Sequence, residues 1–285
     1  MLSLKAQFKS NTEMKDSTLH RAKKMEKHIF SKKYNGIHRN KLLKKIETIR
    51  DCRAPQVKNK LGNYMPHPHS FCKQHKYCEI CANIRRYNKS NNVYDYVENH
   101  KKTLKNKKYY SLVFTIEHKK GRWLSDLVKE VLIHKTTIAN DYKNAIRRRK
   151  NSIFNCDGML VSIEITYNKT NWWNPHINII LCTEKELSIT ISKRKDWKEW
   201  YKNDDVLKKW RDISGYRVWP AITSTKRIKT NKDLKQIIRY IMKFDKTIDE
   251  NLGEYVNVME KKQYRFLEAY GIFKDFLKDT KKSKK

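Results

Sequence analysis

The chain has 285 residues, enough for one domain with appendages or for two domains. Lysine and arginine number 65 and aspartate and glutamate number 30, so the formal net charge is +35, and a polyanion such as a nucleic acid is the expected partner. No apolar run approaches the roughly 20 residues of a membrane-spanning helix, which excludes a transmembrane anchor.

The first 106 residues are basic and poor in large apolar side chains. We expect residues 1–50 to form a basic arm that is mobile or partly helical, with Asn40–Ile49 as its most helical part. Residues 51–106 are expected to form a loop-rich cysteine module that continues into a basic connector at Tyr87–Lys108. Met1–Lys9 lacks the apolar core of a secretion signal, so the sequence predicts a cytoplasmic, reducing environment.

Residues 107–278 show strand and helix patterns, and the tail 279–285 is basic. Alternating, β-branched runs predict strands at Tyr110–Ile116, Met159–Tyr167, His176–Leu181 and Tyr216–Ile222. Apolar residues three or four apart predict helices at Ser125–Arg149, Asp196–Ile213, Asn231–Lys246 and Ile272–Leu277. A turn at Asn171–Pro175 would join the second and third strands as a hairpin. The predicted fold class is α+β, a central antiparallel sheet with flanking helices, preceded by a zinc-binding, loop-rich module.

Four of the six cysteines gather in the module before this core, at Cys52, Cys72, Cys78 and Cys81. Four soft ligands in a segment too polar to fold by apolar burial suit a tetrahedral Zn²⁺ ion, which would then supply local folding energy. Three histidines are alternative ligands, at positions 67, 69 and 75, and unrelated thiols in a loop are the alternative interpretation. The close spacing of Cys78 and Cys81 favours a structural zinc site.

A second set of possible ligands lies on the predicted strands. His176 and Asn178 alternate, so their side chains share one face, and the hairpin would bring Glu164 to the same side. This mixed nitrogen and oxygen set suits Mg²⁺ or Mn²⁺. The alternative is a histidine with purely structural hydrogen bonds.

The helix expected at Asn231–Lys246 carries a possible nucleophile. Tyr240 lies away from the apolar face, with Lys243 one turn further on. A nearby ammonium group and a metal-bound phosphate would favour the phenolate of a tyrosine. The alternative is an exposed tyrosine beside a solvated lysine.

A run of four basic residues stands at the end of the helix expected at Ser125–Arg149. These residues, Arg147, Arg148, Arg149 and Lys150, are predicted to hold nucleic-acid phosphates. The alternative is compositional, because an AT-rich genome raises the lysine, asparagine and isoleucine content of its proteins.

The order of these segments resembles the rolling-circle plasmid replication initiators, a branch of the HUH endonucleases, and also the Borrelia plasmid ORF-A family. The resemblance spans Cys52–Phe276. The matching segments are Phe71–Arg86, Ser111–Ile116, Ile163–Thr166, Trp173–Leu181, Arg239–Lys243 and Tyr270–Lys274.

The resemblance implies an HUH-like fold that nicks single-stranded or hairpin origin DNA and needs neither a membrane nor a small-molecule cofactor. Tyr240 would attack the phosphate and leave a 5′-phosphotyrosine and a free 3′-hydroxyl, with Lys243 orienting the phosphate. His176 and Glu164 would bind Mg²⁺ or Mn²⁺, and the four cysteines zinc.

One residue departs from the family pattern, because Asn178 stands where the family has its second histidine. Asparagine is a neutral and weaker ligand, so metal affinity should fall or the chain should have lost nicking. A non-catalytic DNA-binding protein of plasmid maintenance is therefore an alternative function, and RNA binding is a third.

Overall fold

The computed structural model divides the chain into two compact units. Unit 1 comprises Met1–Asn88 and Lys243–Lys261, and unit 2 comprises Lys89–Met242 and Lys262–Lys285. The structure describes residues 4–31, 36–52, 56–58, 64–66, 71–116, 121–149, 151–170, 172–188, 204–215, 223–242, 245, 247–261 and 264–278. Unit 1 thus combines the predicted arm, the cysteine module and a segment from late in the chain.

Unit 1 is mainly helical in its described part. Its elements are α1 (Leu4–Ser31), α2 (Gly36–Arg50), the antiparallel strands β1 (Gln56–Lys58) and β2 (Tyr64–Pro66), the start of α3 (Glu79–Asn99), the 3₁₀ helix η1 (Thr247–Asn251) and α8 (Leu252–Lys261). Ion pairs tie the late segment to the first two helices. The fully buried Arg21 on α1 pairs with Asp249 at 2.5 Å, and Lys45 on α2 pairs with Glu260 at 2.5 Å.

The helix expected at Asn40–Ile49 lies within α2, whereas the long helix α1 over Leu4–Ser31 was not predicted. Small and apolar side chains three or four residues apart on α1, at Ala22, Met25 and Ile29, are fully buried. On α2 the buried residues are Leu42, Ile46 and Ile49. These stripes are narrow, so the average composition of the segment conceals them. The segment Tyr87–Lys108, expected as a basic connector, contains the second half of α3, which ends at Asn99.

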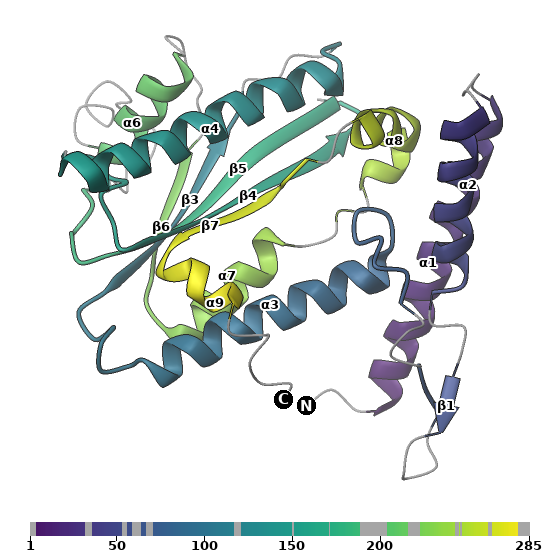
Figure 1. Ribbon diagram of the computed structural model, residues 1–285, viewed down its shortest axis with the longest axis horizontal. Coiled ribbons are helices and arrows are strands. Elements are labelled where there is room, and N and C mark those ends of the chain that lie inside the picture. The colour runs from purple at the N-terminus through teal and green to yellow at the C-terminus, as the bar shows by residue number, and fades with distance from the viewer. Residues whose placement is uncertain are drawn as a thin grey trace. The chain divides into compact units, whose positions relative to one another are not determined.

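Unit 2 is built on a five-stranded antiparallel sheet in its described part (Figure 1). The strands are β3 (Lys108–Thr115), β4 (Gly158–Asn168), β5 (Trp172–Thr183), β6 (Thr223–Ile228) and β7 (Leu267–Gly271). Their order is β6-β3-β5-β4-β7, so β5 is central and pairs with β3 on one side and β4 on the other. The predicted α+β class with a central antiparallel sheet is confirmed.

Helices cover both faces of this sheet (Figure 1). One face carries α4 (Leu124–Arg148) and α6 (Asp205–Ser214), and on it Phe114 stacks on Trp210 with ring centroids 4.6 Å apart. The other face carries the second half of α3, α7 (Asn231–Ile241) and α9 (Ile272–Lys278). Its core includes Leu160 and Ile180 from the sheet and Ile238 from α7. No described helix combines the length and the apolar character needed to cross a membrane.

Several element boundaries differ from the expected ones. Helix α6 begins at Asp205 rather than at Asp196, because the Asp204 side chain caps it by accepting from the amides of Val206 and Leu207. The first part of that expected helix, residues 196–203, lies outside the described residues.

In the C-terminal half, one strand and the end of one helix also lie at other residues than expected. The edge strand is Thr223–Ile228, and the predicted strand Tyr216–Ile222 lies outside the described residues. The hydroxyl of Thr230 caps α7 by accepting from the amide of Asp233, and the helix ends at Ile241 rather than at Lys246. Strand β5 begins at Trp172, inside the turn expected at Asn171–Pro175.

Replacing Gly271 with alanine should destabilise unit 2 by about 3 kcal/mol. Gly271 ends β7 with φ of +55°, and an added Cβ would overlap the carbonyl oxygen of Asp157. Gly215 is the matched control, because it has φ of +70° but open space around it, so Gly215→Ala should cost only about 1 kcal/mol. Urea denaturation followed by circular dichroism measures both, and equal losses would contradict the steric argument.

Candidate metal centres

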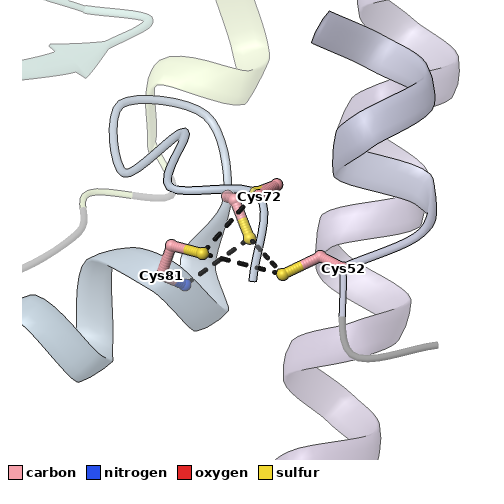
Figure 2. Close-up of side chains that lie close together, drawn as sticks. Cys52, Cys72 and Cys81 are labelled. Carbon is pink, nitrogen blue, oxygen red and sulfur yellow. Dashed lines mark hydrogen bonds between the residues drawn. The ribbon is translucent and has the colours of Figure 1, made fainter. Parts of the chain in front are cut away.

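The four predicted cysteine ligands come from three separate segments of unit 1 (Figure 2). Cys52 follows α2, Cys72 lies in the loop before α3, and Cys78 and Cys81 stand at the start of α3. The ammonium group of Lys15 fixes the end of α2 by donating to the carbonyl oxygens of Arg50 and Cys52, at 2.6 and 2.7 Å.

The sulfur atoms of these cysteines form a compact group. The Sγ of Cys81 lies 3.6 Å from that of Cys52 and 3.5 Å from that of Cys72, and the Sγ atoms of Cys78 and Cys52 are 3.6 Å apart. All four sulfurs lie within 4.8 Å of one another. A tetrahedral zinc site with Zn–S bonds of about 2.3 Å has sulfur–sulfur edges of about 3.8 Å. Disulfide sulfurs would lie only about 2.05 Å apart, so the group fits a metal such as zinc.

The electrostatics of the cluster also suit a cation. Hydrogen bonds from the thiols of Cys72, Cys78 and Cys81 lower the pKa of Cys52. The pKa of Cys72 and of Cys78 is raised, first through their hydrogen bonds to Cys52 and in addition by burial. The pKa of Cys81 is lowered: its hydrogen bond with Cys52 raises it, but those with Cys72 and Cys78 outweigh that effect. Without a metal the group therefore favours a thiolate at Cys52 and Cys81 and resists one at Cys72 and Cys78. A divalent cation removes that resistance, because it neutralises the accumulated charge.

The alternative histidine ligands are not part of the cluster as far as the structure describes them. The imidazole of His75 is exposed, and its Nδ1 lies 3.3 Å from the carbonyl oxygen of its neighbour Lys73. His67 and His69 lie outside the described residues. The remaining cysteines, Cys156 and Cys182, are buried in unit 2.

We expect the purified protein to carry about one zinc ion per chain, measured by elemental analysis. Cys78→Ser should lower this content and reduce helicity, because unit 1 would lose part of its cross-link. Cys156→Ser is the matched control, since that cysteine is also buried but lies outside the cluster. Unchanged zinc content in Cys78→Ser would contradict the four-cysteine site.

The second candidate centre is on the sheet of unit 2. In the antiparallel register of β4 and β5, Glu164 is opposite His176, and Ser162 is opposite Asn178. Residues directly opposite one another point to the same face, and so do alternate residues of one strand. Glu164, His176 and Asn178 therefore share the face that α7 covers. We call these three residues the trio.

Hydrogen bonds orient the trio. The Asn178 amide nitrogen donates to Oε2 of Glu164 at 3.2 Å, and Nδ1 of His176 lies 3.1 Å from Oγ1 of Thr115 on β3. Asn178 is 1% exposed, and its Oδ1 accepts no hydrogen bond from any described residue. A buried carbonyl oxygen without a donor is costly, and a cation is one group that could satisfy it.

The end of α7 is anchored next to the trio. The hydroxyl of Ser162 donates to the backbone carbonyl oxygen of Ile241 at 3.0 Å. Ser162 is opposite Asn178 in the sheet, so the last turn of α7 lies close to the trio. Tyr240 belongs to this turn, and its side chain is 56% exposed. Lys243 lies outside the described residues.

The run of basic residues lies at the C-terminal end of α4. Arg147, Arg148 and Arg149 are exposed, and Arg149 ends the helix in the left-handed conformation with φ of +50°. Lys150 lies outside the described residues.

Sequence analysis missed two residues that orient this site, Thr115 and Ser162. Their signal in the sequence is a hydroxyl inside an otherwise apolar strand. Assigning them to the trio required the strand register, which a single sequence does not provide. In a comparison with known proteins, no family model, no curated protein and no solved structure matches this chain.

Proposed function

We propose that this protein is a plasmid replication initiator that binds origin DNA and nicks one strand through Tyr240. The observation that carries the proposal is the trio beside the last turn of α7, which Ser162 holds to the sheet. Donor atoms of three kinds and an exposed tyrosine thus come from one small region of unit 2. The net charge of +35 supports a nucleic-acid partner.

Each residue of the trio has a role in the proposed site. Glu164 would hold a Mg²⁺ or Mn²⁺ ion through its carboxylate, and Asn178 through the buried Oδ1. The hydrogen bond between Thr115 and Nδ1 of His176 orients the ring so that Nε2 would be the ligating nitrogen. A bound divalent cation supplies Lewis-acid polarisation of the scissile phosphate.

The proposed reaction is a transesterification at phosphorus. The Tyr240 oxygen attacks, the bond between phosphorus and the 3′ oxygen breaks, and the phenol proton goes to solvent while the leaving oxygen takes one up. The products are a 5′-phosphotyrosine and a free 3′-hydroxyl. Arg147, Arg148 and Arg149 are exposed and, with Lys150 of the same basic run, would hold phosphates of the strand. Lys243 would orient the scissile phosphate, as the family resemblance implies.

A second candidate function is DNA binding without nicking. The observation that favours it is the hydrogen bond from the Asn178 amide to Glu164, which partly satisfies this carboxylate without a metal. A histidine at position 178 would instead offer a stronger ligand to a transition metal. In this second candidate function, the basic residues at the end of α4 would still bind DNA and the four cysteines would still hold a metal, but Tyr240 would have no role.

Tyr240→Phe should abolish covalent attachment to single-stranded origin DNA in the presence of Mn²⁺, while DNA binding persists. Removing one oxygen atom removes the nucleophile and leaves the packing of the ring unchanged. The measurement is an adduct band on a denaturing gel, confirmed by mass spectrometry of the modified peptide. Tyr87→Phe is the matched control, because Tyr87 is also 56% exposed but belongs to unit 1. An adduct that survives Tyr240→Phe would eliminate this nucleophile.

Asn178→His distinguishes the two candidate functions. If the trio is a weakened catalytic site, the substitution should raise Mn²⁺ affinity by about tenfold, because imidazole is the better ligand. Adduct formation should rise with it. Isothermal titration with Mn²⁺ measures the affinity, and Asn174→His, four residues earlier on the same strand face, is the control. No gain in either measurement would favour DNA binding without nicking.

A further inference from the structure

A basic cavity lies in unit 2, at the end of β3 remote from the trio. It encloses about 630 Å³ and is lined by the end of α3, the loop that follows, the first residues of β3, the end of β6 and the start of α7. An adjoining hollow of about 530 Å³ shares several of its residues. We call the larger of the two the basic pocket.

Positive charge dominates the lining of the basic pocket. It contains six cationic side chains and no carboxylate: Lys101, Lys105, Lys107, Lys108, Arg227 and Lys229. Four of them pair with carboxylates placed around the rim. Lys101 pairs with Glu98, Lys107 with Asp157 and Glu184, and both Lys108 and Arg227 pair with Glu186.

Two cations of the basic pocket have no counterion within the described part of the chain. Lys105 and Lys229 form no ion pair with any described residue. Gathering like charges in one hollow is unfavourable, and a bound anion relieves the repulsion. Helix α7 adds to the positive potential, because it begins at Asn231 in the lining and its amide groups face its N-terminal end.

Part of the wall of the basic pocket is apolar, which distinguishes it from a surface of solvated lysines. Val97, Leu104, Tyr109 and Ile228 line it, and all four are at least nine-tenths buried. The hydroxyl of Tyr109 is buried, and it interacts with the thiol of Cys182. An apolar wall with a buried hydroxyl beside a cationic rim suits a ligand that combines a flat, uncharged ring with phosphates.

We infer that the basic pocket binds a nucleotide, with its base against the apolar wall and its phosphate on Lys105 and Lys229. The nucleotide is either a unit of a bound strand or a free nucleotide. The inference that it belongs to a DNA strand rests on the proposed function.

The position of the basic pocket favours a strand as the source. Tyr109 in its wall and Thr115 beside the trio are both odd-numbered residues of β3, so they point to the same face of the sheet. Six residue steps separate them, or about 20 Å at about 3.3 Å per residue. Helix α7 crosses this face, beginning at the basic pocket and ending beside the trio. A strand along α7 would reach both.

The test uses two double variants that remove the same charge. Lys105→Gln with Lys229→Gln changes the basic pocket, whereas Lys102→Gln with Lys143→Gln changes exposed lysines of unit 2 outside the lining. Binding of a fluorescein-labelled 16-nucleotide oligothymidylate is followed by anisotropy from 50 to 200 mM salt. We expect the pocket variant to bind about tenfold more weakly, with a salt slope smaller by about 1.4, because two phosphate contacts are lost at about 0.7 each. The control should change little.

A second arm separates the two sources of the nucleotide. Titration with dTTP is measured by calorimetry for the wild type and both double variants. Loss of dTTP binding in the pocket variant alone supports a free nucleotide as ligand, and loss of strand binding alone supports a strand. Thermal unfolding midpoints within about 2 °C of the wild type establish that both variants fold.

The remaining outcomes are decisive as well. If the pocket and control variants weaken every ligand equally, the basic pocket is not a site and the inference fails, while strand binding by the wild type keeps the proposed function standing. If the wild type binds no strand but binds dTTP through Lys105 and Lys229, the proposed function fails and the inference stands. Binding of neither probe by the wild type overturns both.

Discussion

The register between β4 and β5 is the constraint on which the candidate catalytic site depends. It sets Glu164 opposite His176 and Ser162 opposite Asn178 along the centre of the sheet. A slip of one residue would turn either strand over and move its polar groups to the face that α4 and α6 cover. The apolar residues of the same strands resist such a slip, because Ile177 and Ile179 are fully buried on that opposite face. The core therefore fixes the geometry of the polar groups.

Local patterns in the sequence predicted much of this arrangement, and long-range contacts account for what they missed. Alternation on one strand was sufficient to pair His176 with Asn178, and short spacing was sufficient to group Cys78 with Cys81. Helix α1 was missed because its partners lie far along the chain: Arg21 is buried against Asp249, more than 200 residues later. No window of local sequence contains that ion pair, and without it the segment appears too basic to fold.

The two candidate centres use ligands of different hardness for different purposes. Four soft thiolates could hold a metal such as zinc, and a zinc ion with four thiolate ligands would have no open position, which suits a role in folding unit 1. The trio offers a carboxylate, an imidazole and an amide oxygen from two adjacent strands, which leaves part of a cation's coordination sphere open to a phosphate. Asn178 is the weakest ligand of the second set, because it is uncharged and its amide nitrogen already donates a hydrogen bond to Glu164.

Composition alone does not explain how the positive charge is distributed in unit 2. A biased base composition of the genome can raise the number of lysines, but it does not determine which lysines lie close together in the folded protein. In the basic pocket, Lys105 and Lys229 have no counterion among the residues that the structure describes, although Glu98, Glu184 and Glu186 neutralise neighbouring cations. These two lysines line the pocket together with buried apolar side chains and the start of α7. Because carboxylates pair with only some of these cations, the remaining positive charge is concentrated at Lys105 and Lys229. Helix α7 begins at the basic pocket and ends beside the trio. The same helix therefore contributes to both sites on the face where a nucleic acid would bind.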